Sequence, residues 1–138
     1  MAAMVLDSSM TLAWFLPDEA ATAPKELLDR VTDDGAVVPG LWPVEVGNAF
    51  LVAQRARRVT AAARMKALQQ LALLPIEIDT ETTARAWSNS FALGEQYGLT
   101  LYDAVYLELA IRRDLPLASF DGPLCKAARS AGVEVFGG

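Results

Sequence analysis

Residues 100–136, TLYDAVYLELAIRRDLPLASFDGPLCKAARSAGVEVF, alternate between helical periodicity and short apolar runs. Thr100–Arg113 predicts a helix, and Leu117–Phe120 predicts a strand that follows it. Pro123–Ala131 predicts a second helix, and Val133–Phe136 predicts a final strand. Helices that alternate in this way with short apolar strands are typical of a parallel sheet covered by helices.

The same alternation extends through the rest of the chain. The strands expected there are Met4–Asp7, Ala36–Val38 and Pro75–Ile78. The helices expected there are Ser8–Leu16, Pro24 to about Val31, Pro43 to about Arg58, Thr60–Leu74 and Thr80 to Tyr97. This order predicts an α/β fold, a three-layer α/β/α sandwich with a central, mainly parallel five-stranded sheet. The 138 residues show no internal repeat or linker, so we expect residues 1–138 to form a single domain.

The composition excludes several classes of protein. A hydrophobic content of 53% excludes a disordered chain and indicates an apolar surface that a partner covers. No stretch approaches the roughly 18 apolar residues of a membrane span, and the beginning, MAAMVLDSS, does not resemble a signal peptide. Cys125 is the single cysteine, so no internal disulfide is expected, and the reducing cytoplasm is the expected location.

The absence of histidine restricts the possible chemistry. It excludes histidine-based acid–base catalysis and histidine-ligated zinc, and a single cysteine excludes a thiolate metal site. The net charge of −5 argues against a general nucleic-acid coat protein, which would be basic. It does not exclude a site that meets a phosphodiester through a bound cation.

Asp103 raises a question about the helix predicted for residues 100–113. The positions three, four and seven residues after it hold Tyr106, Leu107 and Ala110, so the carboxylate begins an otherwise apolar stripe. An apolar stripe faces the core, where a charge is costly unless it is paired. Asp103 therefore needs a partner that neutralises its charge.

Four acidic residues fall at the same edge of the predicted sheet. Asp7 ends the first strand, and Asp121 directly follows the fourth strand. Glu45 and Asp103 each lie in the first turn of a helix. In parallel sheets, functional groups gather beyond the carboxyl ends of the strands, so we expect these carboxylates to converge. The other acidic residues, among them Asp79 and Glu108, are expected in loops, on exposed helix faces or on an edge strand.

Each of these acids also has a structural explanation when taken alone. Asp7 suits a helix cap, Glu45 complements a helix dipole, Asp103 fits a capping box with Thr100, and Asp121 suits a turn. Together they favour a metal site, because like charges in a partly buried site need protons or a cation to neutralise them. A set of oxygen ligands without His or Cys selects Mg²⁺ or Mn²⁺. The cation would then be the partner of Asp103.

The ordered motifs VLDSS (5–9), PVEVGNAF (43–50), LTLYDAVYLELA (99–110) and LASFDGPLCKAARSAGV (117–133) resemble the PIN-domain family, and in particular VapC-like toxins of toxin–antitoxin pairs. The resemblance covers nearly the whole chain. It implies a PIN-like fold and a Mg²⁺- or Mn²⁺-dependent endoribonuclease that a cognate antitoxin inhibits. By the same resemblance, the products would carry 5′-phosphate and 3′-hydroxyl ends.

The resemblance also implies roles for individual residues. Asp7, Asp103 and Asp121 match acids of the family's quartet and would be metal ligands, directly or through water. Glu45 matches the remaining acid and would be a ligand or would orient the attacking water. The residues expected to support the quartet are Asn48, which would orient Glu45, Ser119, and Ser8.

Expected partners are an RNA substrate, a second copy of the chain in a homodimer, and an antitoxin. The antitoxin would bind an apolar groove on the early helices, near Trp14, Phe15 and Leu16. Basic residues at 55–58 predict a solvated helix end, with a phosphate-contacting rim beside the acidic pocket as the functional alternative. We expect no membrane partner.

Other functions remain as alternatives. A PIN-like module for binding or scaffolding, without significant nuclease activity, is the main one. A phosphatase that forms an aspartyl-phosphate would need a second acid two residues after Asp7, where Ser9 stands. A receiver domain would need an acidic pair that the MAAMV start lacks.

Overall fold

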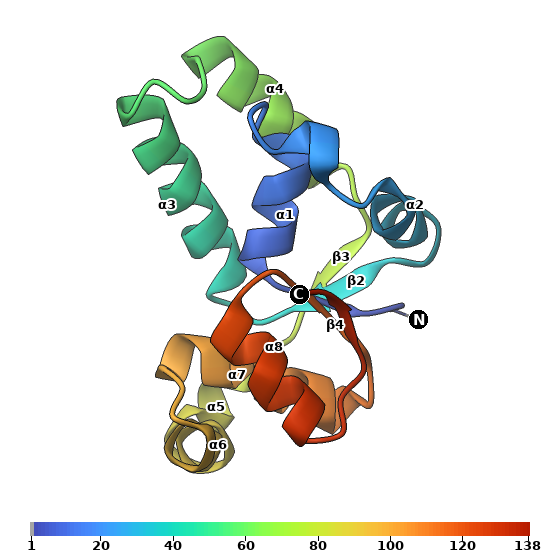
Figure 1. The fold of residues 1–138 in the computed structure, drawn as a ribbon, viewed down its shortest axis with the longest axis vertical. Helices are drawn as coiled ribbons and strands as arrows, with labels where there is room; N and C mark the ends of the chain where they lie inside the picture. Colours follow the sequence, from blue (N-terminus) through green and yellow to red (C-terminus); the bar gives the residue numbers. More distant parts are fainter. Residues whose placement is uncertain (1) are drawn as a thin grey trace.

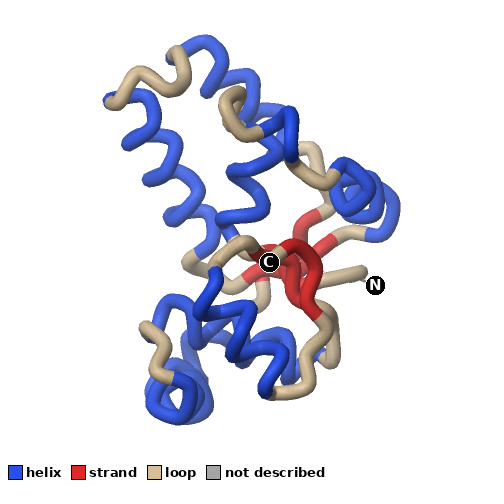
Figure 2. Tube along the Cα trace, viewed as in Figure 1, coloured by secondary structure: helices blue, strands red, loops and turns tan. Residues whose placement is uncertain are grey.

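The computed structural model describes residues 2–138 and has a central sheet of five parallel strands (Figure 2). The strands are β1 (Val5–Leu6), β2 (Ala36–Val38), β3 (Ile76–Ile78), β4 (Leu117–Ser119) and β5 (Val135–Gly137), in the spatial order β3-β2-β1-β4-β5. In register, Val5 of β1 lies opposite Val37 of β2 and Leu117 of β4. The chain first builds the sheet from β1 towards β3 and then crosses to the other side of β1, so the carboxyl ends of β1 and β4 flank the crevice where such sheets bind ligands.

Helices cover both faces of the sheet. They are α1 (Ser8–Phe15), α2 (Lys25–Asp34), α3 (Trp42–Arg55), α4 (Ala61–Ala72), α5 (Thr82–Arg85), α6 (Phe91–Tyr97), α7 (Leu101–Arg113) and α8 (Gly122–Ser130), with a short 3₁₀ turn η1 (Ala20–Thr22) and a π-helical segment η2 (Ala86–Ser90). Figure 1 shows α1, α3 and α4 on one side of the sheet and α6, α7 and α8 on the other. The expected three-layer α/β/α sandwich is therefore confirmed. Among the described residues, no helix is long and apolar enough to cross a membrane.

The core lies between the sheet and these helices. Val5, Leu6, Val37 and Leu117 are fully buried because helices cover both faces of their strands. The edge strand β3 is more exposed, and its last residue, Ile78, has 49% exposure. The central strands are therefore formed by the short apolar runs from which strands were predicted.

Several predicted boundaries differ from the structure. The helix expected from Thr80 to Tyr97 contains the π-helical segment η2 between α5 and α6, and helical dihedral angles at Ala86 and Phe91 keep the three pieces continuous. Helix α2 extends to Asp34 and ends where Gly35 takes φ +84°. Alanine-like side chains are excluded there, because a Cβ on Gly35 would lie 2.8 Å from the backbone oxygen of Pro75.

The expectation of an exposed helix face for Glu108 is wrong, and Asp79, which lies in the loop after β3, is buried as well. Their exposed fractions are 4% and 7%, because Arg112 of α7 neutralises both. Its guanidinium donates to both oxygens of Asp79, at 3.0 and 2.8 Å, and to Glu108 Oε1 at 2.7 Å. Hydrogen bonds from Arg112 lower the pKa of Asp79 well below its ordinary value. This ion network joins the end of β3 to α7 and compensates the cost of burying two carboxylates.

Candidate metal centre

Asp7 lies directly after β1, and its backbone N–H donates to Ala118 of β4 at 3.0 Å. Its side chain is 4% exposed and accepts hydrogen bonds at Oδ2 from Ser119 Oγ at 2.6 Å and Ser9 Oγ at 2.7 Å. Although Asp7 precedes α1, its carboxylate forms no cap bond to that helix. Burial raises the pKa of Asp7, and the bonds from Ser119 and Ser9 lower it in part.

Ser9 and Ser119 form a small hydroxyl network that holds the ends of β1 and β4 together. Ser9 Oγ accepts from the backbone N–H of Phe120 at 2.9 Å and lies 3.3 Å from Ser119 Oγ. Ser119 Oγ in turn accepts from the backbone N–H of Asp121 at 3.0 Å. Ser9 was not among the residues expected to support the site, and its only sequence signal is its place two residues after Asp7.

Asp121 has a structural role in addition to its place at the site. Its Oδ1 accepts from the backbone N–H of Leu124 at 2.9 Å, so it caps the N-terminus of α8 rather than only making a turn. This bond uses one of the two carboxylate oxygens. The second oxygen has no hydrogen bond to another described residue, so a cap and a ligand role are compatible.

Glu45 lies in the first turn of α3 and contacts a residue from α7. Tyr106, which is 0% exposed, donates its phenolic O–H to Glu45 Oε1 at 2.5 Å. Burial raises the pKa of Glu45, the bond from Tyr106 lowers it, and the charges of Asp7 and Asp103 raise it. The sequence analysis placed Tyr106 on the apolar stripe below Asp103 but missed this contact, whose only signal is that shared stripe.

Asp103 lies in the first turn of α7, and Thr100 is the N-cap residue of that helix. The backbone N–H of Asp103 donates to Thr100 Oγ1 at 3.2 Å, while its carboxylate makes no reciprocal bond among the described residues. Burial, followed by the charges of Asp121 and Asp7, raises the pKa of Asp103 to about 6. Within residues 2–138, no lysine or arginine forms an ion pair with Asp103.

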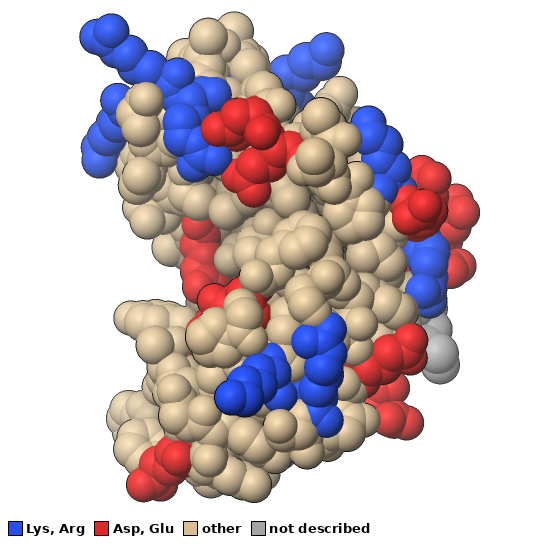
Figure 3. All heavy atoms as spheres, in the orientation of Figure 1, with Lys and Arg blue, Asp and Glu red and all other residues tan. Residues whose placement is uncertain are grey.

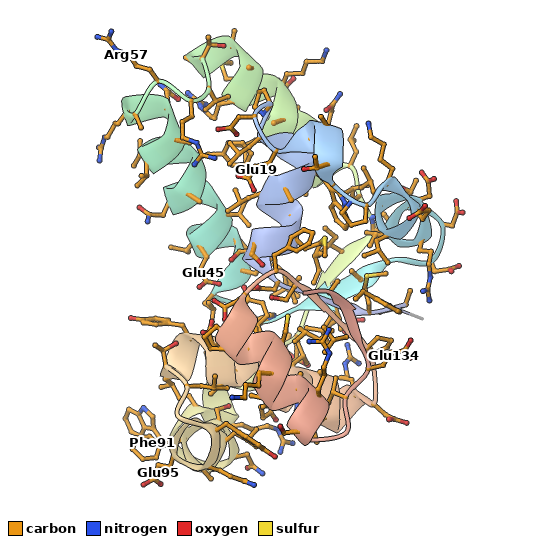
Figure 4. The ribbon with its side chains drawn as sticks, viewed as in Figure 1. Glu19, Glu45, Arg57, Phe91, Glu95 and Glu134 are labelled. Carbon is orange, nitrogen blue, oxygen red and sulfur yellow. The ribbon has the colours of Figure 1, made fainter. Side chains whose placement is uncertain are left out.

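The four acids of the expected quartet face one notch of the molecule. The charges of Asp7 and Asp121 both act on Asp103, and the charges of Asp7 and Asp103 both act on Glu45. Figure 3 shows acidic side chains in the notch between the part of the molecule that carries α3 and the part that carries α8, and Figure 4 places Glu45 at the lower end of α3, facing the same notch. The structure thus brings together four carboxylates from distant parts of the chain.

The four carboxylates lie near one another but do not form a complete metal-coordination site. Within residues 2–138, no three Asp, Glu or Cys side chains meet at the spacing of a metal site. The donor set still fits a hard divalent cation, because it contains only oxygen atoms and because burial and the charges of Asp121 and Asp7 raise the pKa of Asp103. Mg²⁺ fits such an open arrangement, since it usually keeps several waters and uses only one or two carboxylates.

The expected supporting residues differ in their positions. Ser119 is fully buried against Asp7, whereas Ser8 makes only a long contact of 3.5 Å to Asp7 Oδ1. Asn48 is exposed, and its side chain forms no hydrogen bond to Glu45 in the described part of the chain. Tyr106 occupies the place beside Glu45 that was expected for Asn48.

The basic residues at the end of α3 lie far from the notch. Arg58 pairs with Asp18 at 2.8 Å and with Glu19 at 2.9 Å. Figure 4 shows Arg57 and Glu45 at opposite ends of α3. This position favours a solvated helix end over a rim beside the acidic pocket, and a contact of these residues with RNA stays a prediction.

A comparison with protein families matches the PIN domain over residues 4–130. The chain belongs to the PIN-domain family. PIN domains are generally nucleases and generally use divalent metal ions.

The crystal structure of PAE2754 from Pyrobaculum aerophilum superposes on this PIN domain with a TM-score of 0.71 and 20% identity, covering 97% of this chain and 89% of that one. At this identity, the likeness shows a common fold. No curated protein matches the chain.

Proposed function

We propose that this PIN domain is a Mg²⁺- or Mn²⁺-dependent endoribonuclease and acts as the toxin of a toxin–antitoxin pair. The observation that carries the proposal is that the four acids of the quartet lie close enough for their charges to interact, around an Asp7 carboxylate that is buried and held by Ser9 and Ser119. It supports a site built to hold a cation, because within residues 2–138 no lysine or arginine forms an ion pair with any of these four acids. Membership of a nuclease family supports hydrolysis of a phosphodiester as the reaction.

The acidic residues of the notch would have different roles in hydrolysis. Asp7, which Ser9 and Ser119 hold in place, would bind the ion together with Asp103 and Asp121. A bound divalent ion supplies charge neutralisation at the phosphoryl group and a water of lowered pKa. Glu45 has Oε1 occupied by Tyr106, which leaves Oε2 to orient that water towards the phosphorus atom. Products with 5′-phosphate ends are expected.

Exposed aromatic side chains beside the acids support single-stranded RNA as the substrate. Tyr102 directly precedes Asp103 and is 67% exposed, and Phe120 directly precedes Asp121 and is 43% exposed. Aromatic faces stack on unpaired bases without regard to their identity. Stacking would offset the repulsion between an acidic notch and the RNA backbone.

The toxin role requires an antitoxin, and the apolar surface of the protein offers places for one. Trp14 and Leu16 are buried, at 7% and 2% exposure, so the early helices present only Phe15 of the three residues expected there. A cavity of about 240 Å³ lies between α3, α4 and β3 and is lined by Val46, Leu71 and other apolar residues. We propose that an apolar antitoxin segment binds in this region, and that a second copy of the chain covers further apolar surface in a homodimer.

A PIN-like binding module without nuclease activity is the second candidate. The observation that favours it is that no three acidic side chains within residues 2–138 stand at metal-ligand spacing. Such a module would use the notch and the aromatic residues to hold RNA without cleaving it. The RNA-cleavage experiment described next separates this binding module from the nuclease.

The experiment is RNA cleavage by purified protein in Mg²⁺, Mn²⁺ or EDTA, with total RNA as the probe and fragment ends determined by sequencing. We expect cleavage with either metal, none in EDTA, and loss of at least 100-fold in Asp7→Asn. The matched control is Glu95→Gln, which removes an exposed carboxylate of α6 and should keep full activity. Metal-independent cleavage, or equal rates in Asp7→Asn and the parent, would exclude the proposed mechanism.

A further inference from the structure

The hydrogen bond between Tyr106 and Glu45 joins two helices that are not neighbours in the chain. Glu45 belongs to α3 and Tyr106 to α7, and 61 positions separate them. The phenol is 0% exposed and donates its O–H to Glu45 Oε1 at 2.5 Å. A buried phenol needs a hydrogen-bond partner, and Glu45 supplies it. The same bond holds the carboxylate of Glu45 in place.

The contact also determines how Glu45 faces the notch. A glutamate has three side-chain torsions, and one fixed oxygen removes most of this freedom. Tyr106 lies on the same face of α7 as Asp103, one turn further along the helix. The bond therefore sets the carboxylate of Glu45 relative to Asp103, whose charge acts on it.

We infer that Tyr106 is the positioning residue for Glu45 at the metal centre. The inference rests on the proposed function, because it assigns Tyr106 a role in metal binding. Tyr106 touches neither the reacting phosphate nor the ion, and it acts through Glu45. Residues that orient metal-binding carboxylates are typically worth 10- to 100-fold in metal affinity or activity.

The test is the affinity of the purified protein for Mn²⁺, measured by titration calorimetry in Tyr106→Phe. The substitution keeps the buried ring and removes only the hydroxyl. We expect binding about 10-fold weaker than in the parent, with an unchanged circular dichroism spectrum. The matched control is Tyr97→Phe on α6, because the Tyr97 hydroxyl forms no hydrogen bond within residues 2–138. Its affinity should stay within about twofold of the parent.

A double-mutant cycle distinguishes positioning from a general structural effect. Glu45→Ala removes the group on which Tyr106 acts, so Tyr106→Phe should cause no further loss of Mn²⁺ affinity in that background. An effect of Tyr106→Phe that is equally large with and without Glu45 would overturn the inference. Glu45→Ala also tests it if Tyr106→Phe does not fold, since parent-like Mn²⁺ binding in Glu45→Ala would overturn it as well.

Failure of the inference differs from failure of the proposed function. If the parent binds Mn²⁺ and cleaves RNA while Tyr106→Phe binds Mn²⁺ as tightly as the parent, the inference is wrong and the proposed function stands. If the parent neither binds Mn²⁺ nor cleaves RNA, the proposed function is wrong, and the role of Tyr106 is rejected with it.

Discussion

Asp7 and Ser119 lie 112 positions apart in the chain and are joined by a hydrogen bond of 2.6 Å. The bond forms because β1 and β4 are parallel neighbours that end at the same edge of the sheet. It places a buried carboxylate beside the loop that carries Asp121, with Ser9 as a second support. The acidic notch is therefore a consequence of the strand order, and its properties can be tested on the protein without substrate.

Asp103 should make the stability of the protein in EDTA depend on pH. In the unfolded chain its pKa is near 3.8, whereas in the folded protein it is raised to about 6. Between these values the folded state binds more protons, so the free energy of unfolding falls as the pH rises from about 4 to about 6 and stays low above it. Asp103→Asn should reduce this fall, to which Asp7 and Glu45 also contribute, and should be about 1 kcal/mol more stable than the parent at pH 7. Urea unfolding at pH 5 and pH 7 measures both effects.

The control for this prediction is Asp33→Asn, an exposed position of α2. Its pH dependence should follow that of the parent. A parent whose stability is the same at pH 5 and pH 7 would show that Asp103 is not held among the other acids in solution.

Divalent metal should stabilise the parent. A ligand that binds only the folded state at 100 times its dissociation constant adds about 2.7 kcal/mol, which for a domain of this size raises Tm by about 8 °C. Differential scanning fluorimetry with Mg²⁺ or Mn²⁺ measures the shift. In Asp7→Asn the shift should disappear, and a parent Tm that does not respond to millimolar Mn²⁺ would count against a metal site.

Arg112 should matter far more for stability than the adjacent Arg113. Arg112→Ala removes the guanidinium that hydrogen-bonds Asp79 and Glu108 and leaves these buried acids only longer contacts, to Arg113 at 4.0 Å and to Arg85 at 3.7 Å, so we expect a loss of about 3 kcal/mol. Arg113→Ala breaks a pair with Glu77 that is largely exposed, so we expect a loss below about 1 kcal/mol. Equal losses in urea unfolding would show that the ion network is not buried in solution.

Gly35 should be intolerant of a side chain, in contrast to Gly40. Gly35 combines φ +84° with a backbone oxygen of Pro75 that lies 2.8 Å from the position of a Cβ. Gly35→Ala is therefore expected to destabilise the fold by about 2 kcal/mol. Gly40→Ala meets nothing within 4 Å and should stay within about 0.5 kcal/mol of the parent. The midpoint of urea unfolding compares the two, and similar values would contradict the close approach of α2 and β3.

Part of the site could be predicted from sequence because local patterns carry it. Asp7 and Asp121 follow apolar strands, and parallel strands end at one edge, so their meeting follows from the alternation of strands and helices. Asp103 stands out because it begins an apolar stripe. The buried pair of Asp79 and Glu108 was missed, because its neutralisation depends on where Arg112 lies relative to the end of β3.

The sequence by itself determined the parallel α/β architecture, through the periodicity of its apolar residues, and the acids that stand at strand and helix ends. Only the tertiary structure decided which side chains hold those acids. In the structure, Tyr106 and not Asn48 hydrogen-bonds Glu45. Ser9 as well as Ser119 hydrogen-bonds Asp7. The physical reason is that strand and helix patterns are local, whereas a hydrogen bond between α3 and α7 depends on how two distant helices pack.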